Sequence, residues 1–163
     1  MIEAHALRGF PAPLAVAADE VRSASAALGS RLVVLDDDPT GTQSVADLPV
    51  LTAWDAADFA AVFATDAPAV YVLTNARSLG EADARTRNRE VAANALAAAR
   101  EAGVDVEFVS RGDSTLRGHF PLETDTLAET IVAAGGAPID GVLIVPAFPD
   151  AGRVTIGGVH YMR

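Results

Sequence analysis

The chain has 163 residues, of which half are hydrophobic, and its formal net charge is −10. A chain of this length can bury one core, and we expect it to form one domain or a part of one. The negative charge disfavours contact with phosphate backbones and anionic lipid surfaces, so nucleic acid and membranes are poor partners. Small molecules are the better candidates.

The absence of long apolar segments, cysteine and lysine limits where the protein can be located and which reactions its side chains can support. No apolar run approaches the roughly 18 residues that a membrane span needs, and the N-terminus lacks the basic and long apolar segments of a secretory signal. Cysteine is absent, which excludes disulfides and thiolate metal sites. We therefore expect a cytoplasmic protein. All 12 basic residues are arginine, so the chain supplies no lysine as a phosphate clamp or for a Schiff base.

The first half of the chain alternates helical and strand patterns. Residues 15–28 repeat apolar side chains at helical spacing and stop at Gly29, which predicts a leading helix. A short helix is expected at residues 55–64, with Trp54 and Phe59 among its apolar side chains. Strands are predicted at three places: 31–35, 50–53 and 69–73.

The second half continues the alternation. Ser78 and Glu81 have the spacing of a capping box, which predicts the start of a helix that runs to about residue 102. Another helix is expected from Pro121 to Ala134. Strands are predicted at 106–109, 141–145 and 154–161, the last with a bend at Gly157 and Gly158.

This order of elements predicts an α/β fold. Helices between strands indicate right-handed βαβ crossovers, and we expect three layers, with helices on both faces of a mostly parallel sheet. Residues 1–30 would be a helical lead-in, and residues 31–163 would form the domain. The last strand or hairpin leads into nothing, so we expect the domain to be truncated.

Three polar segments are expected at one edge of this sheet. Ligands of open parallel sheets bind beyond the carboxyl ends of the strands, where residues 36–43, 74–78 and 110–119 should lie. The first segment contains Asp36, Asp37 and Asp38, whose mutual repulsion favours a binding role. Strand alternation predicts the first and third aspartates on one side and the second on the other. The structural alternative is Asx-turns before Pro39.

Arginines on the same edge would complement the aspartates. Arg77, Arg111 and Arg117 carry planar guanidinium groups suited to a carboxylate or a phosphate, and acids with arginines suit a polyhydroxylated anion. The alternative is internal ion pairing between Asp113 and either of the two later arginines. We expect His119, at a loop-to-helix junction, to satisfy local backbone groups.

Four sequence blocks together resemble the four-carbon acid sugar kinase family. The blocks are DDDPTGT at 36–42, TNARS at 74–78, SRGDSTLRGH at 110–119, and PAFP at 146–149 followed by GRVT at 152–155. The resemblance covers about residues 31–163. It implies an N-terminal substrate-binding domain of enzymes that phosphorylate tetronates such as threonate, erythronate or oxo-tetronates with ATP, the nucleotide being held by a separate C-terminal domain.

The resemblance also assigns site residues. It implies catalytic roles for Asp37 and Asp38, one of which would be the base by the logic of phosphoryl transfer. The implied substrate-binding residues are Asp36, Asp37, Asp38, Thr40, Gly41, Asn75, Arg77, Arg111, Asp113, Ser114, Arg117 and Gly118. The aspartates would hold substrate hydroxyls, and the arginines would hold the carboxylate or the transferring phosphoryl group.

The cofactor expectations follow from the same resemblance. ATP and Mg²⁺ would serve the full-length enzyme, and none would be bound by this chain, which has no metal site assigned. Neither G-x-x-x-x-G-K-[ST] nor G-x-G-x-x-G occurs in the sequence. The nucleotide domain is thus expected to be absent and the chain inactive alone, with self-association through the surface left uncovered.

Two alternatives remain open at this point. Residues 36–40 fit the D-x-D-x-T motif of haloacid dehalogenase-like phosphatases, with Asp36 as nucleophile, Asp38 as acid/base and Thr74 in the second motif. That hypothesis lacks the lysine of those enzymes and a clear acidic pair after the fifth strand. The other alternative is a non-catalytic small-molecule-binding module, in which the acids and arginines merely pair across loops.

Overall fold

The structure is a computed structural model that describes residues 9, 11–12, 14–113, 117–146 and 148–162. The expected site residue Ser114 lies outside the described residues, as does Ala147 of the fourth sequence block. Among the helices of the described part, none combines the length and apolar character needed to cross a membrane.

The centre of the fold is a four-stranded parallel sheet with the order β2-β3-β1-β4. Its strands are β1 (Arg31–Asp36), β2 (Val50–Leu51), β3 (Ala69–Leu73) and β4 (Val106–Arg111). In the central register, Val33 of β1 lies between Val70 of β3 and Phe108 of β4. The predicted α/β fold with a mostly parallel sheet is therefore confirmed.

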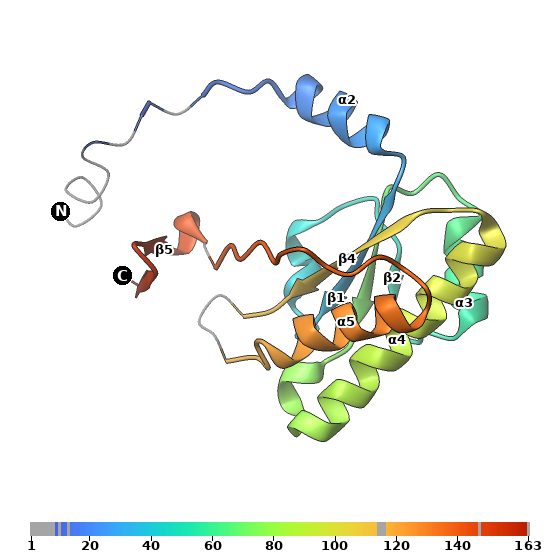
Figure 1. Ribbon diagram of the computed structural model, residues 1–163. Helices are drawn as coiled ribbons and strands as arrows, with labels where there is room; N and C mark the ends of the chain where they lie inside the picture. The colour runs from blue at the N-terminus through green and yellow to red at the C-terminus, as the bar shows by residue number, and fades with distance from the viewer. Residues whose placement is uncertain (1–8, 10, 13, 114–116, 147, 163) are drawn as a thin grey trace.

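Three helices pack together over this sheet (Figure 1). They are α3 (Ala56–Phe63), α4 (Glu81–Ala102) and α5 (Leu122–Ala133). The buried side chains of α4 are mostly alanines, whose small size lets the neighbouring helices approach closely. The core combines these alanines with Val33, Leu35, Val70 and Val72 of the sheet and with Phe59 and Phe63 of α3.

The two faces of the sheet differ in cover. Alternation along β1 directs Val33 and Leu35 toward the helices, where both are buried in the core. On the opposite face Leu32 of β1, Val50 of β2 and Val109 of β4 are between 38% and 41% exposed, while Val34 in the middle of β1 is only 5% exposed. The sequence predicted helices on both faces; in the described residues, α3, α4 and α5 share one face (Figure 1).

Of the helix starts, α4 lacks the capping box that its sequence predicted, whereas α3 has one. Ser78 and Glu81 do not cap α4, because its N-cap is Gly80 without a side-chain cap. The Ser78 hydroxyl instead donates to the carbonyl oxygen of Asn75 at 2.9 Å, within the short 3-10 turn η2 (Ala76–Ser78). A capping box does occur at α3, where Asp55 and Asp58 cap each other's backbone N–H groups.

The N-terminal part of the described chain forms helix α2 (Ala18–Leu28), which starts three residues later than expected. It ends at Gly29, as predicted, with the positive φ of 70° that favours glycine. None of its residues is buried. The helix is a lead-in to β1 and adds nothing to the core.

The predicted strand at 141–145 is wrong for this structure. Residues 141–145 have no regular secondary structure, and the side chains from Val142 to Val145 are 52–92% exposed. An apolar run forms a strand only with a ladder partner, and β4 pairs with β1 alone in the described sheet. The chain ends in an antiparallel hairpin, β5 (Arg153–Ile156) and β6 (Val159–Met162), with the predicted bend at Gly157 and Gly158.

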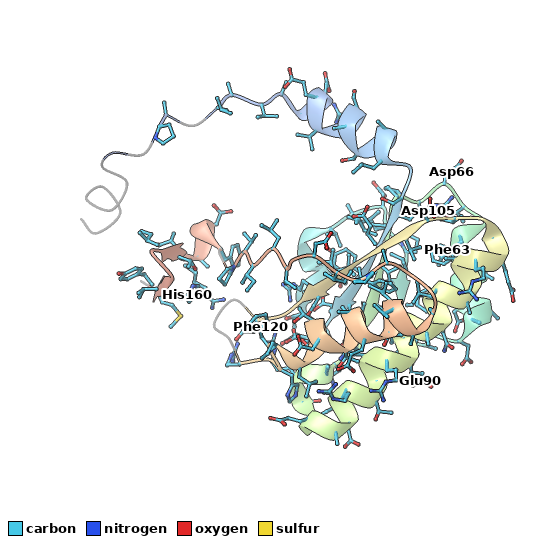
Figure 2. All side chains as sticks on the ribbon, viewed as in Figure 1. Phe63, Asp66, Glu90, Asp105, Phe120 and His160 are labelled. Atoms are coloured by element: carbon cyan, nitrogen blue, oxygen red, sulfur yellow. The ribbon has the colours of Figure 1, made fainter. Side chains whose placement is uncertain are left out.

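Because the strands are parallel, the sheet has one edge of strand amino ends and one edge of strand carboxyl ends. Asp66 and Asp105 precede β3 and β4 and mark the amino ends, whereas Phe120 lies beyond the carboxyl end of β4 (Figure 2). All four strands run in the same direction, so the loops that follow β1, β3 and β4 gather at one edge.

Candidate functional site

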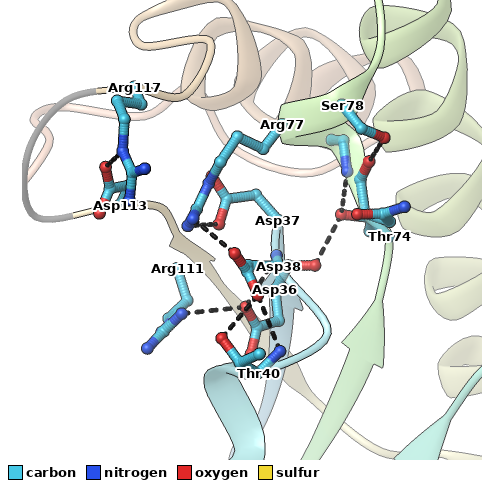
Figure 3. A network of polar contacts seen from close by, with 12 residues as sticks. Asp36, Asp37, Asp38, Thr40, Thr74, Arg77, Ser78, Arg111, Asp113 and Arg117 are labelled. Carbon is cyan, nitrogen blue, oxygen red and sulfur yellow. Dashed lines mark hydrogen bonds and ion pairs between the residues drawn. The ribbon is translucent and has the colours of Figure 1, made fainter.

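The polar segments after β1, β3 and β4 meet at the carboxyl edge of the sheet (Figure 3). Because β1 lies between the other two strands, its last residue contacts both. Thr74 donates its backbone N–H and its hydroxyl to the carbonyl oxygen of Asp36, at 2.9 and 2.8 Å. On the other side, the backbone N–H of Asp37 donates to the carbonyl oxygen of Arg111 at 3.2 Å.

Arg77 joins the aspartates across two loops. Its Nε and Nη2 donate to the two carboxylate oxygens of Asp37 at 3.1 and 2.7 Å, and its Nη1 donates to Oδ2 of Asp38 at 2.6 Å. Asp37 is only 1% exposed, and its hydrogen bonds are the main cause of the raised pKa of Arg77. The guanidinium therefore neutralises two adjacent carboxylates.

Asp36 occupies a separate position beneath this pair. Its Oδ1 accepts hydrogen bonds from Nη1 of Arg111 and from the backbone N–H of Asp38, both at 3.2 Å. Its Oδ2 is buried without a hydrogen-bond partner among the described residues. Burial raises the pKa of this fully buried carboxyl group. A Cβ on Gly41 would overlap the carboxylate, so the close approach requires glycine there.

Asp38 is the most accessible of the three aspartates. Its Oδ1 accepts from the backbone N–H of Thr40 at 2.8 Å and from the Thr40 hydroxyl at 2.6 Å. These hydrogen bonds lower the pKa of Asp38. The first of them is the Asx-turn that the sequence left open as an alternative, and it coexists with the Arg77 ion pair.

The alternation predicted for the three aspartates does not continue past the strand. β1 ends at Asp36, and the chain then turns toward the 3-10 helix η1 (Gly41–Ser44). Asp37 and Asp38 consequently meet on one arginine, whereas Asp36 pairs with a different one.

The two other arginines lie on the rim of this site (Figure 3). The side chain of Arg111 is 40% exposed and forms an ion pair with Asp36 at 3.2 Å. Nε of Arg117 lies 2.5 Å from Oδ2 of Asp113, and this hydrogen bond raises the pKa of Arg117. The internal pairing considered from the sequence is therefore confirmed for Arg117, while Arg111 turns to the aspartate of β1.

This arrangement agrees with the comparison of the chain with known protein families. A family model described as the sugar-binding N-terminal domain matches residues 32–163. The chain belongs to this family. It is the N-terminal domain of four-carbon acid sugar kinases, which confirms the resemblance inferred from the four sequence blocks. No curated protein and no solved structure matches the chain significantly.

The remaining expected residues of the sugar-binding domain lie around the three aspartates. A Cβ on Gly118 would come within 2.9 Å of Oδ2 of Asp37, so this glycine lets the loop after β4 approach the carboxylate. Asn75 adopts a left-handed conformation with φ 50°, and its side chain is exposed at the edge. Their roles toward a ligand stay predictions.

Family membership decides against the phosphatase hypothesis, and the geometry agrees. The proposed nucleophile of that hypothesis, Asp36, is fully buried and packed against Gly41. Burial also raises its pKa, which disfavours the ionised form that a nucleophilic carboxylate needs.

The sequence reasoning missed a buried acid next to this candidate site. Glu123, in the first turn of α5, is 5% exposed. Its carboxylate accepts from the Ser110 hydroxyl at 3.3 Å and from Nδ2 of Asn88 at 3.5 Å. The signal was present: the buried residues of α5 are Glu123, Thr126, Leu127 and Thr130, a helical spacing that places the glutamate on the core-facing side. His119, in contrast, contacts a backbone carbonyl, but a distant one and not the local group that was expected: its Nε2 lies 3.1 Å from the oxygen of Ala76, 43 positions earlier.

The described residues do not fit Mg²⁺. They contain no group of three or more histidine, cysteine or acidic side chains placed to hold a metal ion. The carboxylates that could serve as ligands, those of Asp37 and Asp38, already bind the guanidinium of Arg77, whose positive charge opposes a cation at the same place.

Proposed function

We propose that this sugar-binding domain binds a four-carbon sugar acid, a tetronate, and presents one of its hydroxyl groups for phosphorylation in a kinase. The observation that carries the proposal is the position of Arg111, whose partly exposed guanidinium lies beside the three aspartates at the carboxyl edge of the sheet. A cation next to fixed acids offers complementary groups for the carboxylate and the hydroxyls of one small molecule.

Arg111 is the arginine best suited to hold the substrate carboxylate. Arg77 already donates three hydrogen bonds to Asp37 and Asp38, so its role is to fix those acids. Arg111 donates one hydrogen bond to Asp36, and the rest of its planar guanidinium can form paired hydrogen bonds with a carboxylate.

Asp38 is the aspartate best suited to contact the reacting hydroxyl. Its side chain is 24% exposed, whereas that of Asp37 is nearly inaccessible. The lowered pKa of Asp38 keeps its carboxylate ionised and able to accept a hydrogen bond from the hydroxyl. Orientation of the attacking oxygen by a carboxylate is a recurring part of phosphoryl transfer. Thr40 and Asn75, both exposed at this edge, would bind the remaining hydroxyls.

We assign the phosphoryl donor to a separate part of the enzyme. By family resemblance the donor is ATP with Mg²⁺, held by a nucleotide-binding domain that follows the sugar-binding domain. The residues of the described chain do not fit the metal, and we derive no step through it. The expected activity of this chain by itself is binding, without turnover of ATP.

A thermal-shift titration tests this function. Threonate, erythronate and their oxo forms are added at millimolar concentrations, since a ligand that binds only the folded state raises its stability by RT ln(1 + [L]/Kd). The test variant is Arg111→Ala and the matched control is Arg85→Ala, because the two arginines are 40% and 37% exposed and each forms one ion pair at 3.2 Å. Arg85 pairs with Glu129 on the surface of α4 and α5, away from the aspartates.

The expected result is a stereoselective rise in melting temperature that Arg111→Ala abolishes and Arg85→Ala retains. Two results would overturn the proposal. One is the absence of any shift with all sugar acids, and the other is an equal shift with inorganic sulfate, which would show nonspecific anion binding.

A further inference from the structure

Glu123 is a buried acid with weak partners and no role in the function proposed above. Two contacts of the carboxylate are long for hydrogen bonds, 3.3 Å from the Ser110 hydroxyl and 3.5 Å from Nδ2 of Asn88. The same amide nitrogen donates a shorter bond, 2.9 Å, to the carbonyl oxygen of Ala84. Among the described residues no arginine forms an ion pair with Glu123, so little in its surroundings stabilises a negative charge there.

The position of this acid connects three elements behind the sugar-acid site. Glu123 belongs to α5, Asn88 to α4 and Ser110 to the carboxyl end of β4. Ser110 directly precedes Arg111, and successive side chains of a strand point to opposite faces. A contact that fixes the Ser110 side chain on the helix-facing side therefore fixes Arg111 on the side of the aspartates.

We propose that Glu123 is a positioning residue of the sugar-acid site, which holds the end of β4 through Ser110 so that Arg111 faces the bound acid. This inference rests on the proposed function. Glu123 does this as an uncharged acid: burial, followed by the nearby charge of Asp37, raises its pKa. Ionisation would add a further negative charge beside the carboxylates of the site and weaken the binding of an anionic substrate.

The groups that face Glu123 come from every element around it. Asp37 after β1 raises its pKa, whereas the charge of His119, from the loop before α5, and the hydrogen bonds from Asn88 and Ser110 lower it. His119 is a basic side chain close to Glu123, and any change in its charge would alter anion binding in the same direction. A variant of His119 is therefore needed as a control.

The decisive variant is Glu123→Gln, which has nearly the same shape and stays neutral at every pH. Its amide can accept from Asn88 and donate to the Ser110 hydroxyl. Threonate affinity is measured by calorimetry from about pH 5 to about pH 8 in buffers of different ionisation enthalpy, which reports proton uptake on binding. Because a raised pKa makes Glu123 ionise at higher pH than an ordinary glutamate, we expect the wild-type affinity to fall with rising pH by roughly threefold to tenfold. Threonate binding should be accompanied by proton uptake, and both effects should be reduced in the Gln variant.

Two further variants separate positioning from titration. Glu123→Ala removes the hydrogen-bond partner of Ser110 and should weaken threonate binding at every pH, whereas Glu123→Gln keeps a partner for Ser110 and should bind threonate. His119→Gln keeps a donor near the Ala76 carbonyl and should leave the difference between wild type and Glu123→Gln intact. Equal pH profiles and equal proton uptake for wild type and Glu123→Gln would overturn the proposal.

A measurement without ligand distinguishes failure of this inference from failure of the proposed function. An acid with a raised pKa in the folded state binds its proton more tightly there, so stability is lost as pH rises from the ordinary glutamate range through the raised pKa. Glu123→Gln should therefore gain in unfolding free energy relative to wild type as pH rises. If threonate fails to bind the wild type but this gain appears, the substrate assignment is wrong, while the inference that Glu123 is uncharged in the folded protein is supported. If the difference in unfolding free energy between Glu123→Gln and wild type does not change with pH, that inference is wrong.

Discussion

Arg77 binds both carboxylate oxygens of Asp37: its Nε donates to Oδ2 at 3.1 Å and its Nη2 donates to Oδ1 at 2.7 Å. The two residues are 40 positions apart and follow different strands, β3 and β1. Because Asp37 is buried, the guanidinium is what makes a negative charge tolerable at that position. The ion pair therefore both stabilises the carboxyl edge of the sheet and holds the loops after β1 and β3 together at the site.

Removing this cation should destabilise the domain strongly. Arg77→Ala leaves Asp37 buried and unpaired, and the loss of one partner of a buried pair costs about 3–5 kcal/mol. Denaturant unfolding measures the change, and Arg85→Ala, in an exposed pair with Glu129, should cost less than about 1 kcal/mol. Similar losses for the two variants would contradict the structural role of Arg77.

Gly41 should tolerate no side chain. A Cβ there would overlap the carboxylate of Asp36, and forced rearrangement in a packed site costs about 1–3 kcal/mol. We expect Gly41→Ala to lower the unfolding free energy by this amount and to weaken sugar-acid binding. Gly141→Ala, where a Cβ meets nothing within 4 Å, serves as the control, and an unchanged Gly41→Ala variant would refute the close approach.

The hydrogen bonds of Thr40 should hold the pKa of Asp38 below its ordinary value. A lowered pKa contributes stability that is fully present above the ordinary aspartate pKa and is lost as pH falls through the lowered one. Thr40→Val removes the hydroxyl donor and should raise the Asp38 pKa, as followed by NMR titration of the carboxyl carbon. The control is Thr52→Val, at an exposed threonine, which should leave the Asp38 titration curve unchanged. An unchanged curve for Thr40→Val as well would contradict the prediction that the Thr40 hydroxyl lowers the Asp38 pKa.

Phe59 should be a major source of core stability. It is completely buried and stacks on Phe63 with ring centroids 5.9 Å apart. Phe59→Ala should cost about 3–5 kcal/mol, because the removed ring leaves a cavity, and calorimetric unfolding would report it. Phe120→Ala is the control, since this phenylalanine is 55% exposed. A loss below about 1 kcal/mol at Phe59 would argue against the packing described.

Much of the framework was predictable because its signals are local. The apolar run of β3 was predicted with its observed bounds, Ala69–Leu73. Helix α2 ends at Gly29 and helix α4 ends at Ala102, both as expected. Apolar periodicity and glycine at helix ends act over a few residues. The same reasoning failed for residues 141–145, because an apolar run specifies burial but supplies no neighbouring strand.

The sequence by itself determined that three polar segments lie at the carboxyl edge of a parallel sheet, since strand direction and chain order suffice for that. Only the tertiary structure decided the partners: Asp36 with Arg111, Asp37 with Arg77, and Glu123 buried beside Ser110. Such pairings join residues between 13 and 75 positions apart. They depend on strand register, on where β1 stops and on which side chains lose contact with water, and these are properties of the packed chain as a whole.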